Sequence, residues 1–239
     1  MLLYTHNYII RKMVILLQQY EASIELWDQV YSECELVDIS GGILKVEPTF
    51  DACLRIFSQS SPRVLDFGCG TGDILFQCAD FGYLTYGMGI DRSEVGIHYA
   101  DKMAYLNHYH NLHYITGDID NLVQMDDGCF DGIILSNVLD VIPEDLAHTI
   151  LTEITRILKP EGYLFLKLNP YITKDELIQL GYTPIGDNLY TEDGVLRLRE
   201  IDTQTWYNLL EHSYTVERYL EFPYPWQEGM NRLFLLKKK

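Results

Sequence analysis

The sequence has few basic residues. Among its 239 residues, 18 lysines and arginines stand against 35 aspartates and glutamates, which gives a formal net charge of −17 at pH 7. A surface with this excess of negative charge repels nucleic-acid phosphates and anionic lipid headgroups. We therefore expect neither a nucleic acid nor a membrane as a partner.

Long apolar runs and disulfide patterns are also missing. The longest apolar run near the N-terminus is Met13–Leu17, well short of the ~18 residues that span a bilayer. The five cysteines include no C-x-x-C pair, which argues against a disulfide framework and fits a reducing compartment. We therefore expect a cytoplasmic protein.

Apolar runs and helical periodicity alternate through the middle of the chain. The N-terminal part favours helices at 13–33 and 47–59. Short apolar runs then predict strands at 63–67, 84–90, 112–116, 132–136 and 162–168. Helices are expected between them at 72–81, 93–107 and 146–158. This alternation is typical of an α/β fold, with a parallel sheet and helices on both faces.

The last third departs from this rhythm. Two short strands at 188–190 and 195–201 flank Thr191-Glu192-Asp193-Gly194, which is typical of a hairpin. A helix is expected at 203–212, followed by two strands that can pair antiparallel, at 214–222 and 232–236. No linker rich in proline, glycine or serine separates these parts, so we expect one compact unit. It would comprise an N-terminal helical cap (1–60), a core (61–170), and a hairpin insert with the last two strands (171–239).

The most informative segment is Val64–Gly72, with the sequence VLDFGCGTG. A strand ends in an acid and runs into glycines, which turn tightly and leave no Cβ to block a ligand. The amides at the start of the next helix would then face that ligand. Asp73 stands where a dinucleotide-binding G-x-G-x-x-G turn has its third small residue, which speaks against a nicotinamide-dependent oxidoreductase.

This segment resembles the first motif of class I S-adenosylmethionine (SAM)-dependent methyltransferases. Further segments resemble the later motifs of that family in the correct order: Gly87–Asp91, Thr116–Ile119, Phe130–Leu139 and Leu158–Leu164. The resemblance covers roughly residues 62–170. It implies SAM as the cofactor and a three-layer Rossmann-like fold, with a mostly parallel seven-stranded sheet and an antiparallel last strand.

The resemblance also implies roles for individual residues. Asp91 would bind both ribose hydroxyls of SAM, Asp118 would accept from the adenine amino group, and Ile119 would line the adenine slot. Asp66 would suit the ammonium side of this positively charged cofactor. Further cofactor contacts are expected at Gly68, Cys69, Gly70, Gly72, Arg92 and Ser136. The alternative for Asp91 and Asp118 is a loop or helix-cap aspartate.

Candidates for the methyl-acceptor side are fewer. Methyl transfer mainly requires alignment and exclusion of water, and a general base helps some acceptors. Asp140 follows the fourth strand and could accept a proton or orient the acceptor; the alternative is a helix cap before Pro143. Tyr171 could line the catalytic pocket or simply pack.

The remaining candidates lie on the N-terminal helix and the predicted hairpin. Trp27 and Tyr31 resemble the helical cap of small-molecule methyltransferases, or form an aromatic stripe against the core. Arg197 and Arg199 alternate onto one face of the hairpin and could hold an acceptor's carboxylate or phosphate; the alternative is a solvated edge strand. His108, His110 and His113 lack an obvious partner ligand, so no metal is expected.

The sequence therefore favours an enzyme that moves a methyl group from SAM to a small molecule. The alternatives are a non-catalytic SAM-binding protein and, less favoured, a nicotinamide-dependent oxidoreductase. The acceptor, the methylated atom and the oligomeric state stay open.

Overall fold

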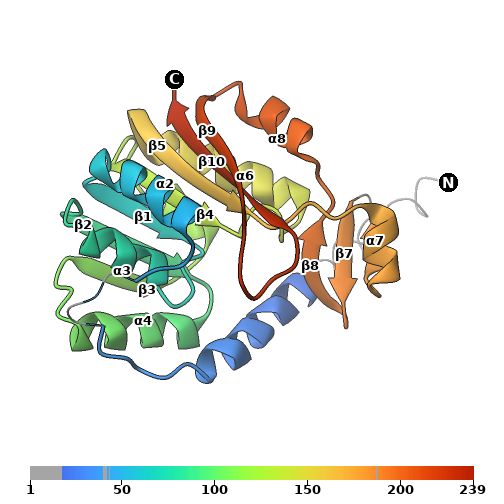
Figure 1. Cartoon of the computed structure of the whole chain (residues 1–239), viewed down its shortest axis with the longest axis horizontal. Helices are drawn as coiled ribbons and strands as arrows, with labels where there is room; N and C mark the ends of the chain where they lie inside the picture. Colours follow the sequence, from blue (N-terminus) through green and yellow to red (C-terminus); the bar gives the residue numbers. More distant parts are fainter. Residues whose placement is uncertain (1–17, 40–41, 43, 187) are drawn as a thin grey trace.

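The fold is built on a seven-stranded sheet with the strand order β3-β2-β1-β4-β5-β10-β9 (Figure 1). The computed structural model describes residues 18–39, 42, 44–186 and 188–239. In sheet order the strands are β3 (Leu112–Thr116), β2 (Tyr86–Asp91), β1 (Arg63–Phe67), β4 (Phe130–Ser136), β5 (Leu158–Leu168), β10 (Met230–Lys238) and β9 (Tyr214–Pro223). β10 is antiparallel to both of its neighbours, and the pairs among β1–β5 are parallel. The mostly parallel sheet with an antiparallel last strand is confirmed.

Helices cover both faces of this sheet, which gives three layers. One face packs against α2 (Pro48–Gln59), α3 (Asp73–Asp80) and α4 (Glu94–Leu106), and the other against α5 (Ile119–Val123), α6 (Glu144–Ile157) and α8 (Thr203–Leu210). Successive strand residues point to opposite faces, so in β1 Val64 joins one core and Leu65 the other. The two-sided α/β arrangement is confirmed.

The chain order creates a switch point between β1 and β4. From β1 the chain moves outward through β2 and β3, whereas β4 and β5 lie on the other side of β1. Open α/β sheets bind ligands at the carboxyl ends of the strands beside such a point. The fold therefore places a binding crevice directly after β1, where the glycine-rich segment lies.

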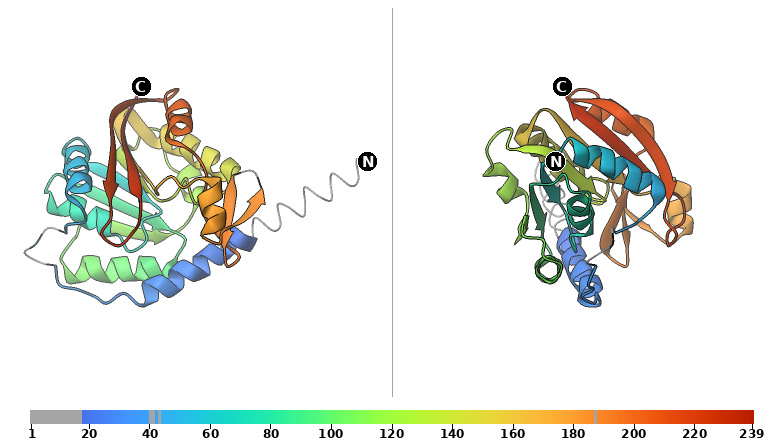
Figure 2. Two further views of the ribbon diagram at one scale, coloured as in Figure 1. Left: turned by 45° about the vertical axis from the view of Figure 1, so that its right-hand side comes forward. Right: turned by 60° about the vertical axis from the view of Figure 1, so that its left-hand side comes forward.

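The N-terminal helix is described over residues 18–32, and its predicted first residues, 13–17, lie outside the described part. It runs outside the main sheet, between the region of α4 and a small second sheet (Figures 1 and 2). This position lets the helix cover the carboxyl ends of the strands.

The second sheet is antiparallel and comprises β6 (Thr183–Gly186), β7 (Leu189–Glu192) and β8 (Val195–Arg199). The predicted hairpin is confirmed as β7–β8, and its turn residues Asp193 and Gly194 have φ of 51° and 81°, as a type I′ turn requires. The sequence analysis missed β6, because Pro184 and Gly186 are typical of a break rather than a strand. It also missed α5 and α7 (Lys174–Gln179), which are too short to show helical periodicity.

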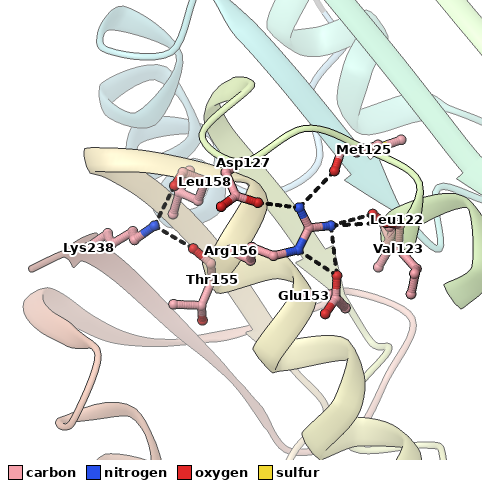
Figure 3. A network of polar contacts seen from close by, with 9 residues as sticks. All are labelled: Leu122, Val123, Met125, Asp127, Glu153, Thr155, Arg156, Leu158 and Lys238. Carbon is pink, nitrogen blue, oxygen red and sulfur yellow. Dashed lines mark hydrogen bonds and ion pairs between the residues drawn. The ribbon is translucent and has the colours of Figure 1, made fainter.

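A polar network lies at the amino ends of β4 and β5, the end of the seven-stranded sheet away from the glycine-rich segment (Figure 3). Arg156 near the end of α6 donates to the carbonyls of Leu122 and Met125 at 2.9 and 2.7 Å and pairs with Asp127 at 2.6 Å. Lys238 of β10 donates to carbonyls at the α6–β5 junction. These bonds give side-chain donors to carbonyls at and just beyond the carboxyl ends of α5 and α6, where the regular helical bonds stop. They tie α5 and the last strand to α6 at the amino ends of β4 and β5.

Candidate active site

A cavity of about 630 Å³ opens at the carboxyl ends of the parallel strands. Its lining comes from the N-terminal helix, the turns after β1, β2, β4 and β5, the second sheet, and the β9–β10 loop. Segments far apart in the sequence therefore meet around one space, at the place that the strand order predicts.

The glycine turn after β1 forms one wall of this cavity. The N–H groups of Gly68 and Cys69 both donate to the carbonyl oxygen of Ile90, at 2.7 and 3.1 Å, which folds the turn against the end of β2. Gly70 has φ of 51°, and a Cβ there would lie 2.6 Å from Tyr31 Oη. A side chain is excluded at Gly70 both by backbone conformation and by space.

Asp91, at the end of β2, is held beside this turn. Its Oδ2 accepts from the Gly70 amide and its Oδ1 from the Ser93 amide, both at 2.8 Å. Burial raises the pKa of the Asp91 carboxyl, although these backbone bonds oppose the rise. Each oxygen keeps acceptor capacity beyond its one backbone bond, and Asp91 lines the cavity. The carboxylate is therefore fixed in orientation and able to accept from a ligand.

The N-terminal helix closes over the same loop. Glu21 pairs with Arg92 at 2.6 Å, and Asp28 accepts from the Ser93 hydroxyl at 2.5 Å. Tyr31 packs against Gly70 and also against Gly96 of α4. Trp27 stacks on Tyr31 with ring centroids 5.6 Å apart, and both line the cavity. The two predicted cap aromatics thus lie where a lid over the glycine turn would place them.

Asp66 lies behind the turn rather than in the cavity lining. Its side chain is buried, and neither carboxylate oxygen has a hydrogen-bond partner among the described residues. Burial, together with the nearby Asp91 and Asp73, raises the pKa of Asp66 well above its usual range. This orphaned acid is a group that a cationic ligand in the adjoining crevice would stabilise.

The other expected cofactor contacts divide into two groups. Gly68, Arg92 and Ser136 line the cavity. Cys69 Sγ instead faces Gly89, Gly72 is the N-cap of α3, and Ile119 packs on the core. Asp118 caps α5: its Oδ1 accepts from the Asp120 amide at 3.0 Å. Its side-chain bonds to the backbone N–H groups of Asp120 and Asn121 match the alternative interpretation of Asp118, while Gly117 before it lines the cavity.

Three acceptor-side candidates lie outside the lining. Asp140 is fully buried and its Oδ2 accepts from the backbone and side-chain N–H groups of Asn169; it caps no helix, because Pro143 is the N-cap of α6. Tyr171 donates to Glu200 at 3.3 Å. Arg199 is buried against the Leu139 carbonyl. Each side chain contacts other groups of the protein, and the acceptor-side roles of these three residues stay predictions.

Arg197 does line the cavity, and its guanidinium pairs with Glu192 at 3.2 Å. Arg197 and Arg199 thus differ in environment although they share one face of β8. In the described part of the chain, no group of three histidines, cysteines or acids could hold a metal ion. No helix in that part is both long and apolar enough to cross a bilayer.

The sequence analysis missed a polar cluster beside the cavity. Lys167, at the carboxyl end of β5, has no exposed surface, and its Nζ donates to Asn137 Oδ1 at 2.7 Å. Burial lowers the pKa of Lys167 to about 8, and the nearby Asp140 opposes this shift. Asn137 and Asn169, after β4 and β5, both line the cavity. The signal that could have found the cluster is a single lysine within the apolar strand YLFLKL.

Comparison with known proteins identifies the family. The family model of a methyltransferase domain matches residues 58–213, which is more than half of the chain. The chain therefore belongs to this methyltransferase family, and the sequence-based prediction of a class I SAM-dependent methyltransferase is confirmed. No curated protein sequence matches it.

Solved structures agree on the fold. A SAM-dependent methyltransferase from Methanosarcina mazei is 20% identical, with a TM-score of 0.65 over 82% of this chain and 99% of that one. The 1,6-didemethyltoxoflavin-N1-methyltransferase of Burkholderia thailandensis is 16% identical, with a TM-score of 0.67 over 98% and 90%. The N-methyltransferase NodS of Bradyrhizobium japonicum is 16% identical, with a TM-score of 0.60 over 80% and 84%.

The glycine turn makes a testable prediction about stability. Gly70→Ala should lower the free energy of unfolding by about 1–2 kcal/mol for the left-handed backbone, plus about 1–3 kcal/mol for the contact with Tyr31. Gly82→Ala is the matched control, since Gly82 also has a positive φ (78°) but open space around it. Urea unfolding should show the larger loss for Gly70→Ala, partly recovered with Tyr31→Phe. Equal losses at the two glycines would contradict the contact.

Lys167 predicts a pH dependence. Below pH 8 its ammonium is charged in both the folded and unfolded states, so the cost of burying it is fully present. As pH rises from about 8 toward the unfolded value of ~10.4, the unfolded chain binds more protons, and stability rises. Wild type should gain about 2–3 kcal/mol relative to Lys167→Met between pH 7 and pH 10. Denaturant unfolding across that range checks this, with the exposed Lys102→Met as control. Parallel curves for wild type and Lys167→Met would show an ordinary lysine pKa.

Proposed function

We propose that this protein transfers the methyl group of SAM to a small-molecule acceptor held in the cavity. The observation that carries the proposal is Asp91, fixed by two backbone amides at the glycine turn, facing a space that the N-terminal helix covers. The cavity volume of about 630 Å³ lies within the range of small-molecule sites.

The residues present fit the cofactor. The two oxygens of Asp91 would accept from the ribose hydroxyls, and the side-chain-free turn at Gly68 and Gly70 would let the cofactor approach the backbone. The adenine would lie toward Gly117, which lines the cavity directly before Asp118. The unpartnered carboxylate of Asp66 favours a positively charged ligand nearby.

SAM, when bound, supplies the methyl group and a sulfur leaving group. The chain's contribution would be alignment and exclusion of water. Tyr31 and Trp27 cover the glycine turn, and the N-terminal helix is tied down by the Glu21–Arg92 pair. Asp140 lies outside the lining. An acceptor whose attacking atom is already unprotonated is therefore favoured, because it needs no carboxylate base.

Two neighbours support a small acceptor. The Burkholderia enzyme, which matches 98% of this chain, was solved with 1,6-didemethyltoxoflavin and S-adenosylhomocysteine bound. NodS is an N-methyltransferase solved with S-adenosylhomocysteine. The acidic composition favours a cytoplasmic enzyme without a nucleic-acid or membrane partner.

Isotope labelling tests the proposed function directly. The protein is incubated with SAM carrying a labelled methyl group and a metabolite extract, and labelled products are identified by mass spectrometry. Labelled small molecules that require the protein are the expected result. If the protein binds SAM but labels nothing, the non-catalytic alternative replaces the proposal; if it binds nicotinamide dinucleotides instead, the oxidoreductase alternative does.

The ribose role of Asp91 is tested by Asp91→Ala. Loss of charge-assisted hydrogen bonds should weaken SAM binding about 10- to 100-fold, measured by isothermal titration calorimetry. Asp145→Ala, at an exposed acid of α6, is the matched control and should leave the affinity unchanged. An unchanged affinity in a folded Asp91→Ala protein would refute the assignment.

A further inference from the structure

Two stacked aromatic rings, Tyr224 and Trp226, lie beside the buried Lys167 and form what we call the aromatic column. Lys167 Nζ lies 4.8 Å from the ring centroid of Tyr224, and Tyr224 stacks on Trp226 with centroids 4.6 Å apart and ring planes at 16°. Both rings line the cavity, and Trp226 is 69% exposed. The column therefore presents a fixed, largely bare indole to the cavity, a surface on which a flat ring stacks favourably.

Asn137 shows hydrogen-bond donors to the same cavity. An ammonium group only donates, so Asn137 Oδ1 must face Lys167 Nζ, at 2.7 Å. The Asn137 amide also donates to the Lys167 carbonyl at 2.9 Å, which anchors its backbone. With its oxygen committed, the exposed side chain of Asn137 has its two N–H groups left for the cavity.

Asn169 presents a hydrogen-bond acceptor to the cavity. A carboxylate only accepts, and Asp140 Oδ2 accepts from both the backbone N–H and the side-chain Nδ2 of Asn169, at 2.7 and 3.1 Å. One of the two N–H groups of Asn169 Nδ2 is thereby committed, which identifies the nitrogen, and Oδ1 is left to accept from a ligand. Asn137 and Asn169 follow neighbouring strands, since Ser136 pairs with Lys167 in the β4–β5 ladder.

The charged residues of the lining disfavour an anionic ligand. Arg92 and Arg197 each already pair with a glutamate, at 2.6 and 3.2 Å, and the other two charged residues of the lining, Asp91 and Glu228, are acids. An anionic acceptor would therefore have to displace an existing ion pair in a protein that is strongly acidic.

We propose that the acceptor is a neutral, planar heterocycle that stacks on Trp226 and presents a lactam-like –CO–NH– edge to Asn137 and Asn169. The carbonyl would accept from Asn137 Nδ2, and the ring N–H would donate to Asn169 Oδ1. This inference rests on the proposed function, because it specifies the substrate of the same site.

Three probes with one skeleton test the inference. 2-Quinolinone is flat and carries the lactam edge, quinoline is flat without it, and octahydro-2(1H)-quinolinone carries the lactam edge without being flat; all three are uncharged at neutral pH. Binding is measured by calorimetry and tryptophan fluorescence in the presence of S-adenosylhomocysteine. We expect 2-quinolinone to bind most tightly, about tenfold tighter than either of the other two. Trp206 is fully buried, so the fluorescence change should come from the cavity.

Variants test whether Trp226 and Asn137 cause the differences in probe affinity. Trp226→Ala should weaken both flat probes by about tenfold, whereas Asn137→Asp, which removes the two donors without changing size, should weaken only the two lactam probes. The controls are Tyr105→Ala, at a ring 87% exposed on α4, and Asn208→Asp, on α8 outside the lining. Both should bind as wild type does.

The results separate the substrate class from the function. Equal affinity for all three probes, absence of binding, or wild-type affinity in the folded Trp226→Ala and Asn137→Asp variants would overturn the planar-lactam inference. So would labelled products that are all non-planar, and in that case methyl transfer itself would stand. If S-adenosylhomocysteine fails to bind, the proposed function fails, and the probe series without it still decides whether the cavity selects flat lactams.

Discussion

The hydrogen bond from the Gly70 amide to Asp91 Oδ2 is the interaction on which the site depends. It exists only because β1 and β2 are parallel and paired in one register, in which Phe67 lies opposite Ile90. A shift of one residue would turn every strand side chain to the other face and separate the glycine turn from the carboxylate. The same register lets Gly68 and Cys69 donate to Ile90, so the turn and the acid are positioned together.

A second constraint is the burial of Lys167, which acts on the other half of the cavity. A buried ammonium is costly unless it has partners, and here those partners are Asn137 and the ring of Tyr224. Satisfying the lysine therefore orients the side chain after β4 and also holds the β9–β10 loop over the site. One charge placed in the apolar second half of β5, residues 163–168, thus organises two cavity segments that lie about 90 residues apart in the chain.

The sequence predicted local features well, but it predicted poorly the contacts between side chains that lie far apart in the chain. The parallel core, the glycine turn and the position of Asp91 follow from patterns within a few residues, and the structure places them as expected. Asp140 and Tyr171 were chosen for their positions after strands, and Arg199 for its place on one face of the hairpin. Side-chain direction at these positions depends on distant partners: Asn169, Glu200 and the Leu139 carbonyl. Lys167 and the Tyr224–Trp226 pair escaped notice because their importance arises only when β5 and β10 lie side by side.

The placement of Asp140 also explains how the acceptor side keeps its shape without presenting a charge to the substrate. Its carboxylate fixes Asn169, and its backbone carbonyl accepts from the Arg199 amide, which ties the second sheet to the β4–α6 loop. Direct exposure of that carboxylate would favour cationic acceptors by Coulomb attraction. Because the acid is buried and bonds to an amide, its charge orients a neutral hydrogen-bonding group, Asn169. Under the proposed function, selectivity would then depend on the geometry of the acceptor's edge more than on its charge.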